Sequence, residues 1–523
     1  MSQHEADATE GGDDGEIRRV PSLVPGLDAV LHGGFLQGGV YILQGPAGAG
    51  KTILASQIIY NRAATEGDRA LFVTVLGENH GRMLAHLRPM HFFNPALVSE
   101  RVTYISAYQA LDDGGLKGLA TLIRREIQAH GATLLVLDGM SAVVAKAGAG
   151  FEMKRFTHEL QTLASATSCT MLLLTTGSGA TTAPEHTMVD GLIELRQRLY
   201  GVRNERRLLV HKLRGSGFLE GEHAFHITRG GIAVFPRIEA LLSMPTHRDP
   251  PPIWRMPSGI ASFDAMLGGG IPAATMTALV GPSGAGKTTV GLQFLASSSA
   301  VEPGLLFGCY ETPERLRLKA KTMGLDLAAA EQCGQAEILW HPMGEHLLDG
   351  LAHQLLDAVR RRGVKRLVID GISGFQQAAV EPERIVRFWS ALSNELRALG
   401  VATLYTLEMP ELMGPDIRVP VNGMSSIAEV MVLLRYVELR SRLYRLISLF
   451  KVREGAFDPT IREFAITGAG IVVGAPFEGV EAVLSGMARE AAQRAAAARR
   501  AAAATGGSAE GSPAPGNDTV RSG

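Results

Sequence analysis

Short apolar runs alternate with amphipathic stretches along most of the chain, and the whole alternation occurs twice. Such runs are typical of strands buried on both faces of a parallel sheet, with the intervening helices covering those faces. We therefore predict an α/β fold in which each half holds a mostly parallel sheet with helices on both faces. The strands are expected at residues 40–43, 70–76 and 133–137, and again at 277–280, 305–307 and 366–369.

The two halves repeat at a fixed interval. The segment GLDAVLHGGF, which starts at Gly26, is matched by SFDAMLGGGI, which starts at Ser262. Asp264 follows Asp28 by 236 positions, and a lysine pair described below has the same spacing. A repeat that holds its register over this length indicates two whole domains in tandem.

The chain divides into four predicted parts. We expect an acidic, disordered segment at 1–16, a first domain at 17–246, a second domain at 247–485, and an Ala/Arg-rich helix with a disordered tail at 486–523. The domain boundary falls in the proline-rich stretch around residues 244–252, because proline forbids helix there.

Each half contains one glycine-rich loop between an apolar strand and an amphipathic helix. The loops read GPAGAGKT and GPSGAGKT, and both fit the P-loop pattern, in which backbone N–H groups surround a polyphosphate. We predict ATP binding in both halves. The expected binding residues are Gly45, Gly48, Ala49, Gly50, Lys51 and Thr52 in the first loop, and Gly281, Gly284, Ala285, Gly286, Lys287 and Thr288 in the second.

A strand that closes on an aspartate follows each P-loop. Asp138 and Asp370 take this place, and such a carboxylate completes a Mg²⁺ site together with the P-loop hydroxyl of Thr52 or Thr288. Glycine follows both aspartates, where many ATPases have a glutamate that polarises the attacking water. The base is therefore expected elsewhere.

Two glutamates are candidates for that base. Glu78 and Glu311 follow the second predicted strand of each half. We expect this strand to lie beside the P-loop strand, so that the carboxylate faces the γ-phosphate in a RecA-type arrangement. The alternative is that both are ordinary surface carboxylates.

Two cations alternate along a late strand in each half. They are Lys212 and Arg214 in the first half, and Lys451 and Arg453 in the second. Alternation places both on one face of a strand. They are candidates for catalytic fingers on the phosphates of a neighbouring subunit. A solvated strand face is the alternative.

Composition narrows the range of functions. The 523 residues contain 51 Lys and Arg against 52 Asp and Glu, so no overall basic character supports nucleic-acid binding. We see no signal peptide and no apolar stretch that could span a membrane, and we expect a cytoplasmic protein. The three cysteines lie far apart without zinc-ligand spacing, and no metal beyond Mg²⁺ is expected.

Beyond the P-loops, several short segments carry a family resemblance. They are HGG at 32–34, KLRGS at 212–216, GEHAFHI at 221–227, YVELR at 436–440 and IREF at 461–464. With the duplication, they resemble two-domain KaiC-like proteins, the circadian-clock ATPases and autokinases built from two RecA-like domains. The resemblance spans residues 17–485.

The resemblance implies a homohexamer of two stacked rings with ATP between subunits. It also implies hydrolysis in the first ring, a serine/threonine autokinase in the second, and protein signalling partners. The family's acceptor pair precedes the strand that ends in YVE, where this chain has Ser425 and Ser426. Plain turn hydroxyls are the alternative for both serines.

Three functional classes follow from these observations. The first is a signalling or timing ATPase with autokinase activity. The second is a DNA-stimulated ATPase of the recombinase type, which has the same core. The third is a nucleotide-dependent scaffold without turnover.

Overall fold

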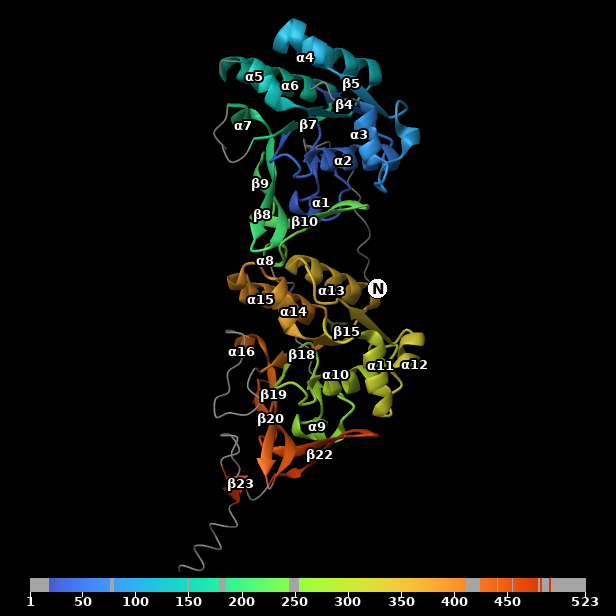
Figure 1. Ribbon diagram of the computed structural model, residues 1–523, viewed down its shortest axis with the longest axis vertical. Helices are drawn as coiled ribbons and strands as arrows, with labels where there is room; N and C mark the ends of the chain where they lie inside the picture. Colours follow the sequence, from blue (N-terminus) through green and yellow to red (C-terminus); the bar gives the residue numbers. More distant parts are fainter. Residues whose placement is uncertain are drawn as a thin grey trace, which may run out of the picture. The chain divides into compact units, whose positions relative to one another are not determined.

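The structure is a computed structural model (Figure 1). It describes residues 18–75, 80–147, 150–177, 184–243, 254–409, 424–439, 441–453, 455–477, 480–481 and 489–490. The acidic segment at 1–16 and the proline-rich stretch at 244–252 lie outside these residues.

Two compact units account for the chain. The first comprises residues 1–246, 345–355 and 378–392, and the second comprises residues 247–344, 356–377 and 393–523. Each unit contains one large sheet, and each is described by itself below.

The first sheet has nine strands among the described residues, and five of its neighbouring strand pairs are parallel while three are antiparallel. In spatial order they are β11 (Gly231–Phe235), β10 (Glu222–Thr228), β9 (Arg203–Leu213), β8 (Gly191–Tyr200), β3 (Val40–Gln44), β7 (Thr170–Thr175), β6 (Leu134–Asp138), β4 (Ala70–Thr74) and β5 (Val102–Ser106). The helices are α1 (Leu27–Val30), α2 (Lys51–Thr65), α3 (His80–Leu87), α4 (Tyr108–His130), α5 (Met140–Ala147), α6 (Gly150–Thr167), α7 (Pro184–Met188) and α8 (Ile238–Leu241). A short strand pair, β1 (Arg19–Val20) with β2 (Phe35–Leu36), and a 3₁₀ turn, η1 (Pro95–Leu97), complete this part.

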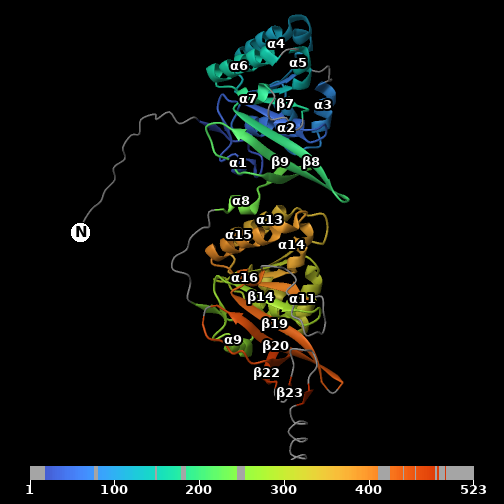
Figure 2. The ribbon, with the colours of Figure 1, turned by 90° about the vertical axis from the view of Figure 1, so that its left-hand side faces the viewer.

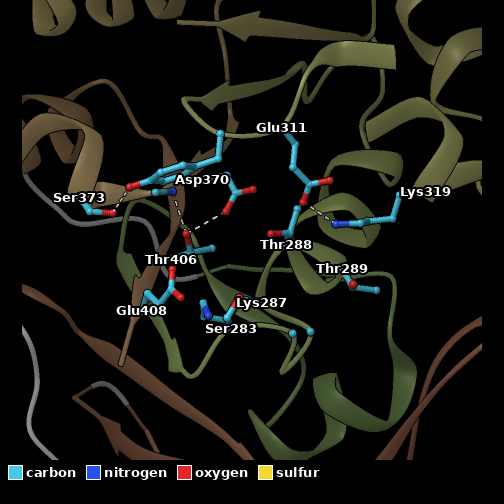
Figure 3. Close-up of a pocket in the computed structure, with 14 residues that line it drawn as sticks. Ser283, Lys287, Thr288, Thr289, Glu311, Lys319, Asp370, Ser373, Thr406 and Glu408 are labelled. Carbon is cyan, nitrogen blue, oxygen red and sulfur yellow. Dashed lines mark hydrogen bonds and ion pairs between the residues drawn. The ribbon is translucent and has the colours of Figure 1, made fainter. Parts of the chain in front are cut away.

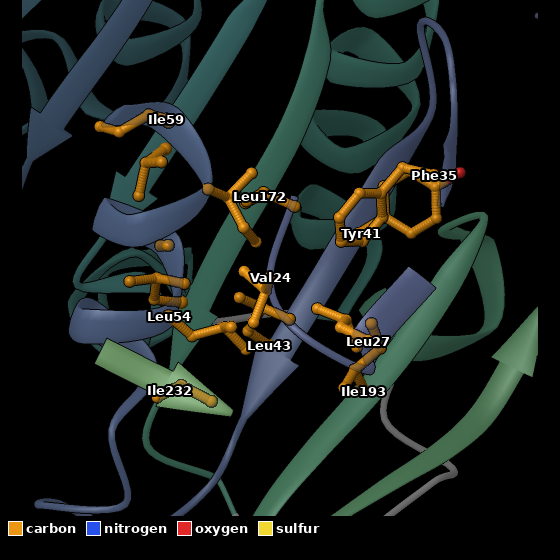
Figure 4. Packing of buried hydrophobic residues seen from close by; sticks show 14 of the residues in the cluster. Val24, Leu27, Phe35, Tyr41, Leu43, Leu54, Ile59, Leu172, Ile193 and Ile232 are labelled. Carbon is orange, nitrogen blue, oxygen red and sulfur yellow. The ribbon is translucent and has the colours of Figure 1, made fainter. Parts of the chain in front are cut away.

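Strand β3 shows why the sequence runs are continuously apolar. Successive side chains of a strand point to opposite faces. Val40 and Ile42 pack in the cluster that holds α4, α5 and α6. Tyr41 and Leu43 pack in the opposite cluster, which holds Leu54 of α2 (Figure 4). Both faces of the central strand are therefore covered by helices.

The second sheet repeats this order, with nine strands over the described residues. They are β16 (Ala336–Trp340), β15 (Gly304–Gly308), β17 (Arg366–Asp370), β18 (Ala402–Glu408), β14 (Met276–Gly281), β19 (Val430–Leu439), β20 (Arg442–Val452), β21 (Arg462–Thr467) and β22 (Gly470–Pro476) (Figure 2). The helices are α9 (Ala261–Met266), α10 (Lys287–Ala296), α11 (Pro313–Thr322), α12 (Leu327–Gln332), α13 (Leu348–Arg362), α14 (Ile372–Ala378), α15 (Ile385–Ala398) and α16 (Met424–Ile427). The pairs β12 (Arg255–Met256) with β13 (Ile271–Pro272) and β23 (Val480–Glu481) with β24 (Arg489–Glu490), and the turn η2 (Pro382–Arg384), are also present.

These two sheets confirm the predicted fold class. The six predicted strands correspond to β3, β4, β6, β14, β15 and β17, with bounds within two residues of those expected. Two details differ from the expectations. Arg214 and Arg453 each follow the last residue of their strand rather than lying within it. Within the predicted tail at 486–523, Arg489 and Glu490 form a short strand; the rest of the tail outside these two residues is not described.

None of the described helices combines the length and the apolar character that crossing a bilayer requires.

Candidate nucleotide-binding sites

Both P-loops connect the central strand of a sheet to a helix that packs on it. The first joins β3 to α2, and the second joins β14 to α10. Gly50 and Gly286 precede the helices with φ angles of 105° and 108°, a left-handed conformation that disfavours residues with a Cβ atom. A glycine at this position lets the loop turn into a helix, and a helix N-terminus favours phosphate binding.

The P-loop lysines are held inside their own loops. The ammonium group of Lys287 donates to the carbonyl oxygens of Gly281 and Pro282, both at 2.8 Å. Burial lowers the pKa of Lys287, while the negative charges of Glu408 and Asp370 act in the opposite direction. These contacts place a desolvated cation where the β- and γ-phosphates of a nucleotide lie in P-loop proteins.

Lys51 repeats this arrangement in the first site. Its ammonium group donates to the carbonyl oxygens of Gly45 at 2.7 Å and Pro46 at 2.9 Å. Burial lowers the pKa of Lys51, and Asp138 opposes this shift.

The predicted hydroxyl and carboxylate pairs are in direct contact. Thr52 Oγ1 donates to Asp138 Oδ2 at 3.1 Å, and the Thr288 hydroxyl donates to Asp370. Burial raises the pKa of Asp370, and hydrogen bonds from Thr406 and Thr288 oppose that shift. Hydroxyl and carboxylate oxygens are the ligands that Mg²⁺ prefers, so the chemistry of both pairs fits this ion.

A cavity of about 460 Å³ opens beside the second P-loop. Figure 3 shows the side chains around it, which come from the P-loop and the start of α10, from the carboxyl ends of β15, β17 and β18, and from α11 and α14. They are Ser283, Gly284, Gly286, Lys287, Thr288, Thr289, Tyr310, Glu311, Lys319, Asp370, Gly371, Ser373, Thr406 and Glu408. The cavity thus joins most of the residues predicted for the second site.

Glu311 reaches this cavity, but not from the strand that the sequence suggested. The expectation that its strand lies beside the P-loop strand is wrong, since β14 is flanked by β18 and β19, and β15 pairs with β16 and β17. Parallel crossovers need not join neighbouring strands, and chain order therefore does not give sheet order. Glu311 lies three residues beyond the end of β15 and forms an ion pair with Lys319 of α11 at 2.5 Å.

Its counterpart Glu78 lies outside the described residues. The flanking strand β4 pairs with β5 and β6, so the same correction of strand order applies to the first half.

Gly371 shows why a glutamate does not follow Asp370. Its φ is 97°, and a Cβ atom there would lie 2.3 Å from Cε2 of Tyr310. A larger residue would have to displace the tyrosine ring, which bonds Ser373 through its hydroxyl at 2.6 Å.

The predicted cation pairs hold a short helix in place. Lys451 Nζ donates to the carbonyl oxygens of Ser425 at 2.6 Å and Ala428 at 2.7 Å. Arg453 donates to the carbonyl oxygen of Ser426 at 2.7 Å. Burial and the neighbouring Arg453 lower the pKa of Lys451. The side chains of Ser425 and Ser426, which lie on α16, are exposed.

The first half contains the same construction. Lys212 donates to the carbonyl oxygen of Thr187 at 3.0 Å, and Arg214 donates to those of Thr187 at 2.9 Å and Met188 at 3.0 Å. Helix α7 thus occupies the place of α16, with His186 and Thr187 where the second half has the two serines.

Eight residues that line the second cavity were not predicted from the sequence, and three of them bond or flank the predicted ones. Thr406 donates to Asp370 Oδ1 and accepts from the backbone N–H of Gly371, both at 2.8 Å. Lys319 pairs with Glu311, and Glu408 ends the strand next to the P-loop strand. An apolar run closing on an acid at 402–408 was the available signal for Glu408.

Together, the fold and the sites define a P-loop ATPase with two tandem RecA-like domains. A family model described as "ATPase: KaiC" matches residues 20–239 and 256–478. The chain therefore belongs to the KaiC ATPase family.

Curated relatives match the chain over nearly its full length. The circadian clock oscillator protein KaiC of Thermostichus vulcanus is 26% identical over 501 residues, which are 93% of this chain and 94% of that protein. The KaiC proteins of a Picosynechococcus species and of Synechococcus elongatus are 27% and 26% identical, and each match covers 90% of this chain and 92% of the relative.

Proposed function

We propose that the chain forms a homohexameric ring that hydrolyses ATP at the first site and phosphorylates Ser425 or Ser426 from the second site. Its phosphorylation and nucleotide state then report to protein partners. The names of the curated relatives, which are clock oscillator proteins, support a signalling or timing role.

The position of α16 is the observation that carries the proposal. Helix α16 precedes β19, whose first residue Val430 pairs with Thr277 near the start of β14. The P-loop begins at Gly281, the other end of the same strand. Four residues of strand separate the two levels by roughly 13 Å. The acceptor serines of a chain and its own phosphate site thus lie at opposite ends of the strands of one sheet. This separation favours transfer between subunits.

The cation pair of the second half lies at the same end of the strands as the acceptor serines. Lys451 pairs with Met431, and the backbone N–H of Arg453 donates to the carbonyl of Glu429. Their own phosphates are therefore remote, and we assign Lys451 and Arg453 to the γ-phosphate of a neighbouring subunit. We assign the same role to Lys212 and Arg214 at the first site. Such fingers neutralise charge that develops on the transferred group.

The remaining roles follow from the contacts within each site. Lys51 and Lys287 bind the phosphates, and Glu311 and Glu78 act as bases toward the attacking oxygen. Magnesium, which neutralises the β- and γ-phosphate charge, would be held by Thr52 with Asp138 and by Thr288 with Asp370.

Transfer of label from [γ-³²P]ATP tests this proposal. We expect label on the protein as well as free phosphate, with no stimulation by single-stranded DNA. Stimulation by DNA without protein labelling would instead support a recombinase-type ATPase. Tight ATP binding without either product would leave a nucleotide-dependent scaffold.

A further inference from the structure

One hydroxyl group in the second cavity bonds to two successive residues. Thr406 of β18 donates to Asp370 Oδ1 and accepts from the backbone N–H of Gly371, both at 2.8 Å. A backbone N–H can only donate, so the Thr406 oxygen accepts from Gly371 and its own proton is directed to Asp370. Figure 3 shows Thr406 facing Asp370, with a dashed line for their bond. A single side chain thus engages both the carboxylate and the turn that follows it.

This contact lies away from solvent. Thr406 and Asp370 are both buried, and a buried carboxylate needs hydrogen-bond donors from the protein. Asp370 receives them from Thr406 and from Thr288. Because Thr288 is itself a proposed Mg²⁺ ligand, Thr406 is the donor that can hold the carboxylate without binding the ion.

The two halves differ at the position of Thr406. Thr406 pairs with Leu279 of β14, and Leu174 of β7 pairs with Leu43 of β3. Leu279 follows Leu43 by 236 positions, which is the spacing of the repeat. Leu174 is therefore the equivalent of Thr406, and a leucine side chain has no hydrogen to donate. At this position the second site has a hydroxyl and the first site has an apolar side chain.

We propose that Thr406 is a positioning residue of the second site, which holds the Asp370 carboxylate in the orientation that binds Mg²⁺. This inference rests on the proposed function, in which Asp370 and Thr288 hold that ion. A hydrogen bond to one carboxylate oxygen restricts rotation of the group, and partners of this kind orient metal ligands. The bond to Gly371 restrains the backbone beside Asp370 through the same hydroxyl.

The test measures metal binding directly, in full-length protein that is loaded with ADP and freed of excess nucleotide. Mn²⁺ replaces Mg²⁺, and the free ion is measured by electron paramagnetic resonance. Asp370→Asn removes the carboxylate of the second site, and thereby identifies the class of bound Mn²⁺ that belongs to it. Thr406→Val removes the hydroxyl at nearly constant volume, Thr406→Ala repeats the removal with a smaller side chain, and Thr406→Ser retains the hydroxyl.

Thr403→Val is the matched control. Thr403 lies on the same strand and is also buried, and its hydroxyl has no hydrogen-bond partner among the residues that the structure describes. Thr403 does not line the cavity. Hydrogen exchange of the Gly371 amide, measured without nucleotide or metal, reports on the second bond of Thr406 in each variant.

We expect Thr406→Val and Thr406→Ala to weaken Mn²⁺ binding at the second site about 10- to 100-fold, the range for partners that orient metal ligands. Thr406→Ser and Thr403→Val should match the unsubstituted protein. Exchange of the Gly371 amide should be faster only where the Thr406 hydroxyl is lost. The Mg²⁺ concentration that gives half-maximal phosphoprotein should rise by the same factor as the Mn²⁺ dissociation constant.

Unchanged Mn²⁺ affinity in Thr406→Val, with faster exchange at Gly371, would overturn the inference, because the hydroxyl would then hold only the backbone. Equal weakening in Thr403→Val would also overturn it, since the loss would not come from the bond to Asp370. Either result leaves the proposed function intact. If Asp370→Asn removes no class of bound Mn²⁺, the metal role of Asp370 in the proposed function is contradicted as well.

Discussion

The ammonium group of Lys451 donates a hydrogen bond to the backbone carbonyl of Ser425 across 2.6 Å. One cation thus fixes the segment that carries the proposed acceptors, while the chain's own P-loop lies at the other edge of the sheet. The proposed finger on a neighbour's phosphates and the proposed acceptor helix are therefore parts of the same surface.

This arrangement predicts complementation between two inactive variants. Neither Lys451→Ala nor Lys287→Ala should phosphorylate itself, since fingers of this kind contribute about 10³-fold or more to the rate. A mixture should recover activity, because Lys451→Ala subunits keep the ATP site and Lys287→Ala subunits keep the finger and acceptor. Mass tags on one variant identify the labelled chain. Phosphate should appear on the Lys287→Ala chains, and its absence from the mixture would contradict transfer between subunits.

The two P-loop lysines predict separable losses. Lys51→Ala should remove nucleotide binding at the first site and weaken assembly, since ATP is expected between subunits. Lys287→Ala should abolish phosphorylation while leaving hydrolysis at the first site. Phosphate release and phosphoprotein, measured in parallel on both variants, check this division. Normal phosphorylation in Lys287→Ala would show that the second site is not the kinase.

The role proposed for Glu311 predicts that its loss slows the chemical step without changing the affinity for ATP. Glu311→Gln should slow phosphorylation by about 100-fold, as expected for the loss of a general base, while ATP affinity stays the same. Single-turnover labelling and equilibrium ATP binding separate the two quantities. Glu314→Gln is the control, because the Glu314 side chain is 78% exposed and lies outside the cavity. An unchanged labelling rate would remove Glu311 from the mechanism.

The buried side chain of His223 is expected to make the stability of the first half depend on pH. Its Nδ1 accepts from the backbone N–H of Arg237 at 3.1 Å, and its Nε2 donates to the carbonyl of Leu219 at 2.9 Å. Burial lowers the pKa of His223 from 6.5 to about 4. At a pH between these two pKa values, the locally unfolded state binds a proton on His223 that the folded state does not. The neutral ring thus stabilises the fold above pH 6.5, and that stability is lost as the pH falls toward 4.

A shift of this size corresponds to about 3 kcal/mol between the two limits. Hydrogen exchange of the Arg237 amide, corrected for its intrinsic rate, measures the free energy of local opening at pH 7 and pH 4.5. We expect a clear decrease at the lower pH, and a much smaller one in His223→Asn. Equal decreases in both proteins would mean that other groups are responsible.

Sequence predicted the strands well because a strand covered on both faces must be apolar throughout. The run at 40–43 is such a case, since alternate side chains pack into two different clusters. The P-loop pattern predicted one site for Lys287, Thr288 and Asp370, and these residues line one cavity in the structure. The hydrogen bonds of Lys287 to the carbonyl oxygens of its own loop were not predicted.

The order of the strands within each sheet could not be predicted from the apolar runs. The prediction placed Glu311 beside the P-loop strand, whereas the strand in that position ends at Glu408. Long-range pairing decides which strands become neighbours, and an apolar run does not record its partner. For the same reason the sequence did not reveal that Lys451 caps the helix of Ser425, 26 positions earlier.

Peptide mass spectrometry of the full-length protein after incubation with Mg²⁺ and ATP tests the central claim most directly. The account predicts phosphate on Ser425 or Ser426, and no phosphate there in a Lys287→Ala control. ATP consumed without phosphate on either serine would contradict the autokinase and leave a KaiC-family ATPase whose second site signals by binding nucleotide.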